Sequence, residues 1–129
     1  MLRPVQRCVG VVLGFVLLGA TEGTLSAAGH GNVEAGKQLY QTRCTPCHGP
    51  NGNGNTPTAQ ALHPRPRDHT DGAYMNQLSN EHLVKILKQG GAAVRKSPLM
   101  PPQADLSEQQ IQDLIAFVRT LAVPPYREH

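Results

Sequence analysis

Two cysteines with two residues between them, followed at once by a histidine, form the segment Cys44-Thr45-Pro46-Cys47-His48. This pattern is typical of the covalent attachment of haem c, in which each thiol bonds one vinyl group of the porphyrin. The adjacent imidazole is then placed where it can reach the iron. We therefore predict one haem c bound through Cys44 and Cys47, with His48 as an iron ligand. A chain that carries this group must fold around a large planar apolar surface.

A secretory signal is predicted at the N-terminus. Two arginines precede an apolar stretch over residues 8–20, and small residues follow at Ser26 and Ala28. Charged, apolar and small-residue segments in this order are the layout of a cleaved signal peptide. The apolar stretch is shorter than the roughly 20 residues that span a bilayer, although an uncleaved anchor is the alternative. We expect residues 1–28 to be removed, which leaves residues 29–129 as one exported domain.

The cysteine count argues against other uses of the motif. Cys8 lies in the predicted signal, so Cys44 and Cys47 are the thiols that remain after cleavage. A structural zinc site would need four ligands, and the scattered histidines offer no second pair at a suitable spacing. A disulfide oxidoreductase fits an oxidising compartment, but no strand pattern that would carry its site can be read. A non-haem thiol protein is therefore the remote alternative.

The composition agrees with an attached cofactor. The chain has no Trp and three Tyr, and Phe117 is its only Phe after the predicted cleavage point. A domain of about 100 residues with so few aromatic side chains needs another source of buried apolar area, which a porphyrin supplies. The formal net charge of the whole chain is only +3, too small to indicate binding to nucleic acid or to a membrane surface.

The first predicted helix leads into the haem motif. Asn32 is a good N-cap residue, and Val33, Gly36 and Tyr40 recur at intervals of three or four residues. Cys44 continues this spacing, so we expect the face that carries these residues to point inward. Glycine costs up to about 1 kcal/mol in a helix relative to alanine. A close helix–helix contact at Gly36 would explain it, and a tolerated surface glycine is the alternative.

Two further helices are predicted nearer the C-terminus, separated by Gly- and Pro-rich loops. One extends from Ser79 to Gln89 and ends at the glycines that follow. The other begins with a capping box formed by Ser107 and Gln110, and ends before Pro124. No strand pattern competes with these helices. The predicted fold class is therefore all-α, with about three main helices and long loops wrapped around one covalent haem.

The second axial ligand of the iron decides between electron transfer and ligand chemistry. The methionines after the predicted cleavage point are Met75 and Met100. Met100 lies between Pro98 and Pro101, and prolines reduce the entropy that a loop loses when it holds a weak sulfur–iron bond. We predict Met100 as the ligand and expect Met75 to pack against the ring edge or the core.

Ligation by a second histidine and an open sixth position are the alternatives. His63 and His69 flank a loop rich in Pro and Arg, and His82 lies in the first turn of the second predicted helix. Other residues supply the apolar stripe of that helix. We therefore expect all three histidines to be solvated polar side chains.

Together these features resemble a class I monohaem cytochrome c of the bacterial periplasmic type. The resemblance covers a cytochrome c domain over residues 29–129. It rests on four segments, Cys44–Gly49, Gly36…Tyr40, Pro98-Leu99-Met100-Pro101 and Leu114…Phe117. It implies that the first and last helices cross, with Gly36 and Tyr40 against Leu114 and Phe117.

The resemblance also implies residues around the haem. The family usually fixes the proximal imidazole through the backbone carbonyl of a proline, for which Pro57 is the matching candidate. Some members bond a haem propionate through a Trp, which this chain lacks. Tyr74, Arg67 or Arg65 could take that role, although a solvated loop explains the two arginines equally well.

The implied function is single-electron transfer in the periplasm by a low-spin haem with His48 and Met100 as axial ligands, without enzymatic activity. The implied partners are redox proteins, a donor dehydrogenase or an acceptor oxidase or reductase, with neither nucleic acid nor stable membrane insertion after signal cleavage. A haem-bearing subunit of a periplasmic dehydrogenase and a haem ligand-binding protein with a labile sixth site are the alternatives. Five basic residues could dock an acidic partner or be ordinary solvated side chains: Lys37, Lys85, Lys88, Arg95 and Lys96.

Overall fold

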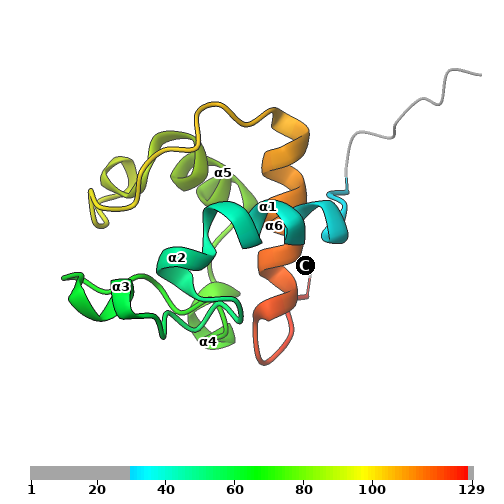
Figure 1. The fold of residues 1–129 in the computed structure, drawn as a ribbon. Coiled ribbons are helices and arrows are strands. Elements are labelled where there is room, and N and C mark those ends of the chain that lie inside the picture. The colour runs from blue at the N-terminus through cyan, green and yellow to red at the C-terminus, as the bar shows by residue number, and fades with distance from the viewer. Residues whose placement is uncertain (1–29, 128–129) are drawn as a thin grey trace, which may run out of the picture.

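The computed structural model describes residues 30–127, and the predicted signal over residues 1–28 lies outside this range. The elements are α1 (Val33–Arg43), α2 (Thr45–His48), α3 (Pro57–Ala61), α4 (Gly72–Met75), α5 (Asn80–Gln89), the 3-10 helix η1 (Gly91–Val94) and α6 (Glu108–Leu121). Within residues 30–127, the one extended pairing is an isolated bridge between Asp71 and Val123. The predicted all-α fold class is confirmed (Figure 1).

The three predicted helices are α1, α5 and α6, and their ends follow local capping chemistry. The side chain of Asn32 accepts a hydrogen bond from the backbone N–H of Ala35, and Ser79 caps α5 in the same way. At the start of α6, Ser107 and Gln110 form both bonds of the predicted capping box. Gly90 ends α5 with φ of +79°, a backbone angle that residues other than glycine disfavour because of their Cβ atom.

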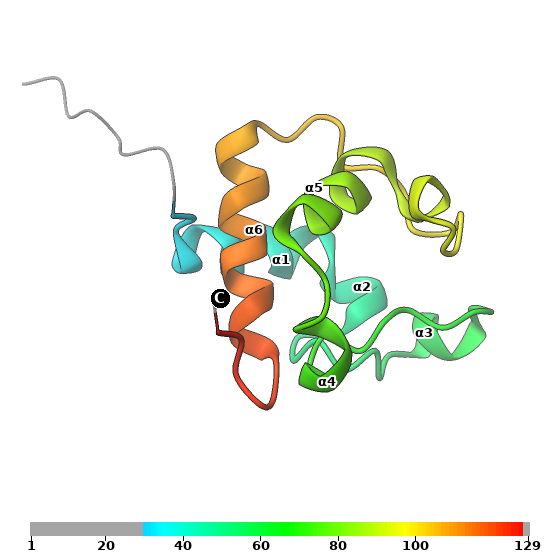
Figure 2. The same ribbon diagram turned by 180° about the vertical axis from the view of Figure 1, so that it is seen from behind.

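α1 crosses α6 in close contact, as the views from both sides show (Figures 1 and 2). A Cβ atom on Gly36 would lie 1.9 Å from the backbone oxygen of Asp113, so only glycine allows this approach. The ring of Tyr40 lies 5.1 Å from that of Phe117. The predicted crossing is confirmed at these residues. Val33, which was expected on the same inward face, is a correction, because its side chain remains 44% exposed.

The hydrophobic core is built around α6. Its buried members are Tyr40, Met75, Leu83, Leu106, Ile111, Leu114, Ile115, Phe117 and Ala122. Arg119 joins this core to the segment between α4 and α5, because its buried guanidinium donates to the backbone oxygen of Met75 at 2.7 Å and to Asn80 Oδ1 at 2.9 Å. Its guanidinium also lies 3.8 Å from the ring centre of Tyr126. These contacts fix where α5 begins.

The remaining elements α2, α3, α4 and η1 have four or five residues each. Isolated helices of this length are unstable in water, so tertiary contacts stabilise them. They are also too short to be predicted from a hydrophobic periodicity in the sequence. Among residues 30–127, no helix combines the length and the apolar content that crossing a bilayer requires.

Candidate functional site

A cavity of about 650 Å³ lies against the core. Its lining comes from α2 and residues 62–69 on one side and from α5 and residues 95–103 on the other, which the ribbon shows as two separate layers (Figures 1 and 2). Apolar side chains form much of the wall: Leu62, Leu78, Leu83, Ile86, Leu87, Leu99, Leu114, Ile115 and Val118. Its size lies within the range of roughly 300–1,000 Å³ that is usual for cofactor sites.

The motif residues share one wall of this cavity. Cys44 is both the C-cap of α1 and the N-cap of α2, and the backbone N–H of His48 donates to the oxygen of Cys44 at 2.8 Å. This single turn places Cys44, Cys47 and His48 at positions i, i+3 and i+4, which lie on the same side of a helix. Gly49 ends the turn with φ of +78°. All three motif residues line the cavity.

The thiol chemistry of this turn differs from that of a disulfide oxidoreductase. Both cysteines are free thiols. Burial is the main cause that raises the pKa of Cys44 to about 11, and the lowering effect of Arg43 does not offset it. Reactive CxxC sites have a depressed thiol pKa instead. The raised pKa of Cys44 therefore gives no support to a reactive CxxC thiol site.

The imidazole of His48 is oriented by a backbone carbonyl. Its side chain is buried, and its Nδ1 lies 2.9 Å from the oxygen of Arg67. With Nδ1–H donating to this oxygen, Nε2 keeps its lone pair for a metal. Burial lowers the pKa of His48, which favours this neutral form.

The role expected for Pro57 is corrected by this hydrogen bond. Pro57 is the first residue of α3, where Thr56 caps the helix by accepting from the N–H of Ala59. The α3 turn lengthens the loop after His48, so the chain returns to the imidazole only at Arg67. Sequence reasoning named Arg67 for its side chain and missed its backbone oxygen, for which the sequence carries no signal.

His69 is a second correction, because it is not a solvated side chain. Its ring stacks on that of His48 with centroids 4.2 Å apart and planes 17° apart. Its Nδ1 lies 3.1 Å from the hydroxyl of Tyr40. Burial is the main cause that lowers the pKa of His69 to about 3. If His48 were to hold an iron, a ring stacked on its face would lie beside it and would not be placed to be a second ligand on the far side of the metal.

Both methionines line the cavity. Met75 is 2% exposed and belongs to the core, as expected for a packing residue. Met100 is half-buried, and its backbone oxygen accepts from the N–H of Gly91 at 3.0 Å. His82 is also half-buried and lines the cavity, whereas His63 is exposed and is not part of its lining.

Cationic side chains gather on the cavity wall around Tyr74. The guanidinium of Arg67 lies 3.8 Å from the centre of the Tyr74 ring, and the ammonium of Lys96 lies 5.8 Å from it. Arg65 and Arg95 line the same cavity. The structure thus brings Arg67 to Tyr74 and adds Lys96 beside the same ring, whereas Arg65 shares only the lining of the cavity with them.

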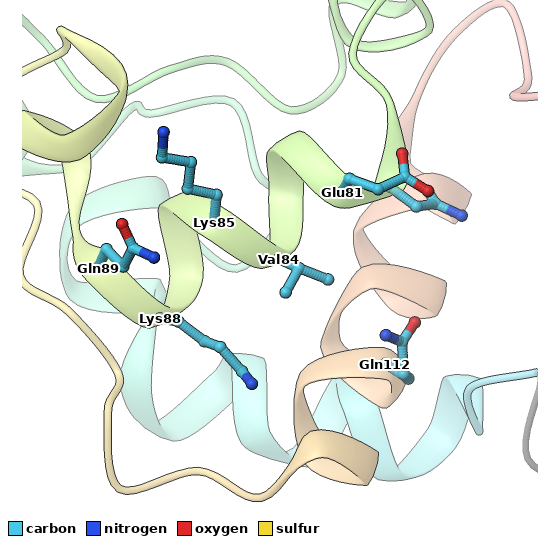
Figure 3. Close-up of a pocket in the computed structure, with 7 residues that line it drawn as sticks. Glu81, Val84, Lys85, Lys88, Gln89 and Gln112 are labelled. Carbon is cyan, nitrogen blue, oxygen red and sulfur yellow. The ribbon is translucent and has the colours of Figure 1, made fainter.

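A second hollow of about 490 Å³ lies on the surface between α5 and α6. Figure 3 shows Val84 and Lys88 of α5 and Gln112 of α6 around it, while Lys85 points away from α6. Lys88 forms an ion pair with Glu108. None of the motif residues lines this hollow, so it is not part of the candidate site.

Comparison with known proteins identifies the family of the chain. The cytochrome c family profile matches residues 33–122. The chain is 33% identical over 123 residues to the thiosulfate dehydrogenase of Allochromatium vinosum. The aligned region covers 92% of this chain and 42% of that protein. The chain therefore spans less than half the length of this curated relative.

Two solved structures share the fold. One is a chain of the reducing HAO-like protein complex of Kuenenia stuttgartiensis, with a TM-score of 0.62 and 24% identity over 76% of this chain and 48% of that one. The other is the KustC0563 c-type cytochrome, with a TM-score of 0.56 and 26% identity over 67% of this chain and 96% of that one. The family match contains the attachment motif and both methionines of the cavity. The chain belongs to the cytochrome c family.

Proposed function

We propose that this chain is a single-electron carrier with one haem c, bound through Cys44 and Cys47, and with His48 and Met100 as axial ligands of the iron. Membership of the cytochrome c family supports haem-based electron transfer. The observation that carries the residue assignment is the single cavity lined by all four of these side chains. The apolar wall, the two free thiols and the imidazole with a free Nε2 fit a covalently attached porphyrin.

When bound, the haem iron supplies the one-electron chemistry by alternating between its ferrous and ferric states. The role of the protein is to hold the haem in place and to tune its reduction potential. Arg67 orients His48 through its backbone oxygen, and such a bond raises the basicity of a ligating imidazole. The apolar lining keeps water away, and low polarity disfavours the additional positive charge of the ferric state.

Met100 is the proposed sixth ligand because its loop is anchored at the cavity. Its backbone is bonded to Gly91, and the N–H of Gln103 donates to the oxygen of Leu87 at 2.7 Å. These bonds tie Met100 to the start of η1 and the residues that follow it to the end of α5. A thioether opposite a histidine raises the reduction potential of the iron. Met75 is packed in the core, where its side chain serves the fold.

The cations around Tyr74 are proposed to bind the propionates of the porphyrin. Arg67 is held over the Tyr74 ring at 3.8 Å, a cation–π arrangement that restricts its guanidinium. Guanidinium groups bind carboxylates with paired hydrogen bonds. Arg67 and Tyr74 are therefore the proposed propionate residues, and Lys96 approaches the same ring.

We further propose that the chain is exported to the periplasm after removal of residues 1–28, and that it exchanges electrons with redox proteins there. One observation favours a second candidate, a haem-bearing subunit of a periplasmic dehydrogenase. The relative at 33% identity is a thiosulfate dehydrogenase of more than twice the length that this chain covers. Copurification of this chain with a catalytic chain would identify the second candidate.

The proposal is tested by optical spectra of the exported protein in its ferric and reduced forms, with and without carbon monoxide. A low-spin spectrum, a weak long-wavelength sulfur–iron band and no response to carbon monoxide are expected. The band should be lost in Met100→Ala and kept in the matched variant Met75→Ala. Loss in Met75→Ala alone would assign the ligand to Met75. Rapid binding of carbon monoxide by the unaltered protein would replace the carrier with the ligand-binding alternative.

A further inference from the structure

We propose that His69 is a positioning residue that fixes the plane of the His48 imidazole, and that Tyr40 holds His69 in this place. The proposal rests on the proposed role of His48 as an iron ligand. It assigns a function to a half-buried histidine that neither the attachment motif nor the binding of methionine requires.

The first step is the contact between the two rings. Their centroids are 4.2 Å apart and their planes differ by 17°, so the face of His69 covers the face of His48. The hydrogen bond to the oxygen of Arg67 fixes the direction of Nδ1. The outer torsion of a histidine side chain is broad, however, so this bond alone leaves the ring free to tilt. A parallel ring at van der Waals distance removes that freedom.

The second step is the contact that holds His69. Tyr40 is fully buried, and its hydroxyl lies 3.1 Å from Nδ1 of His69. A buried tyrosine hydroxyl needs a partner, and the neutral imidazole accepts at Nδ1 when its proton is on Nε2. The two rings also meet edge to face at 5.8 Å. A phenyl ring at position 69 would stack on His48 but would not accept from Tyr40.

The third step is the rigidity of both supports. Tyr40 lies at the crossing of α1 and α6, with its ring 5.1 Å from Phe117. The backbone N–H of His69 donates to the oxygen of Gly52 at 2.7 Å. A Cβ atom on Gly52 would lie 2.7 Å from Leu121 and 3.2 Å from the Cβ of His69, so this loop is closely packed on both sides. The helix crossing is thus linked through Tyr40 and His69 to the imidazole of the attachment motif.

The consequence is electronic. In a ferric low-spin haem, the plane of an axial imidazole and the orientation of an axial methionine together determine how unpaired spin spreads over the four ring methyl groups. Because His69 contacts His48, its replacement acts on the contribution of the imidazole. The pattern of the shifted methyl proton resonances therefore reports the ligand plane, which is set by its surroundings. Overall stability does not change this pattern unless the ring itself moves.

The test is the proton NMR spectrum of the ferric holoprotein for the unaltered chain and for His69→Leu, His69→Phe and Tyr40→Phe. We expect His69→Leu to redistribute the methyl shifts, and His69→Phe to restore most of the original pattern because it stacks. Tyr40→Phe should cause a smaller change in the same direction. His63→Leu is the matched control, because His63 is exposed and is not part of the cavity wall; its pattern should equal that of the unaltered chain.

Two results would overturn the inference, and they differ from a failure of the proposed function. An unchanged methyl pattern in His69→Leu shows that the ring plane is set without His69. If that variant does not take up haem, an unchanged pattern in Tyr40→Phe would overturn the part of the inference in which the Tyr40 hydroxyl holds His69 against His48. A failure of the proposed function appears instead in the unaltered protein, which would then lack the shifted methyl resonances of a low-spin ferric haem.

Discussion

The two walls of the haem cavity are held in different ways. On the His48 wall, side chains are fixed by other side chains and by one carbonyl. His48 is bonded to the oxygen of Arg67 and covered by His69, which Tyr40 holds from the helix crossing. Each of these contacts joins groups that are far apart in the sequence, and Tyr40 links the wall to the core.

The Met100 wall is a loop whose backbone is tied to the end of α5. Gly91 and Gln103 provide its backbone hydrogen bonds. Met100 is half-buried and Leu99 is 54% exposed. Just after this loop, Asp105 forms an exposed ion pair with Arg43 at the end of α1, at 2.6 Å, which joins the chain after the loop to α1.

The two walls therefore have different roles. A buried wall built from long-range contacts can set the geometry of one ligand, and changing it should affect the whole fold. A loop with local backbone bonds opens at a lower free energy than the core does. Changes there should affect access to the iron more than stability.

Gly36→Ala should have the largest effect, because it separates the helices that support the His48 wall. The new Cβ would lie 1.9 Å from a backbone oxygen of Asp113, which no side-chain rotation can relieve. We expect a loss of more than about 3 kcal/mol in the free energy of unfolding, measured with denaturant on the holoprotein. Gln41→Ala on the exposed face of α1 is the control and should change little. A stable Gly36→Ala protein would contradict the tight crossing.

The two methionines test the difference between a core support and a loop support, because Met75 lines the cavity from the core and Met100 lines it from the loop. Met75→Ala removes a side chain that is 2% exposed and should cost about 3 kcal/mol of unfolding free energy. Met100→Ala removes a half-buried side chain, so the protein part should lose less stability while carbon monoxide binding appears. Thermal unfolding and carbon monoxide titration of both variants measure the two effects. Equal effects of both changes would mean that the two walls do not differ.

Arg119→Met tests the support beneath α5. The buried guanidinium donates to the backbone oxygen of Met75 and to Asn80. Its removal leaves buried acceptors without their donor, which should cost about 2 kcal/mol. Hydrogen exchange should show the loss first in the amides around residues 76–82. Protection lost evenly over the whole chain would contradict a local role for Arg119.

The sequence predicted well where the signal is local or covalent. Capping residues located α1, α5 and α6, and the attachment motif located the cavity. Gly36 and Tyr40 were expected at the crossing because the spacing and the family resemblance agree, and the structure places them there.

The contacts around His48 could not be predicted in the same way. They depend on the path of residues 49–69, which contains only one short helix and no periodic pattern. The resemblance led to Pro57, while the length of this loop brings Arg67 to the imidazole instead. The one usable hint for His69 was chemical: a tyrosine expected in the core needs a hydrogen-bond partner, and a histidine can provide one.

Asp105→Asn should have the smallest effect, because the ion pair with Arg43 is exposed. The hydrogen bond from Arg43 is the main cause that lowers the pKa of Asp105 in the folded protein. A carboxyl with a lowered folded-state pKa stabilises the fold above its unfolded-state pKa, and this contribution is lost as the pH falls through the folded-state value. The unaltered protein should therefore be slightly more stable than Asp105→Asn at neutral pH, and the two should converge in acid. Denaturant unfolding at both pH values, repeated in high salt, measures the difference, which salt should also reduce.

The rate of carbon monoxide binding tests whether this ion pair also restrains the loop that holds Met100. Glu108→Gln removes another exposed ion pair, with Lys88, and serves as the control, because it should leave carbon monoxide access to the Met100 wall unchanged. If Asp105→Asn accelerates carbon monoxide binding while Glu108→Gln does not, the ion pair with Arg43 restrains the loop that holds Met100; equal rates would leave its backbone bonds as the restraint.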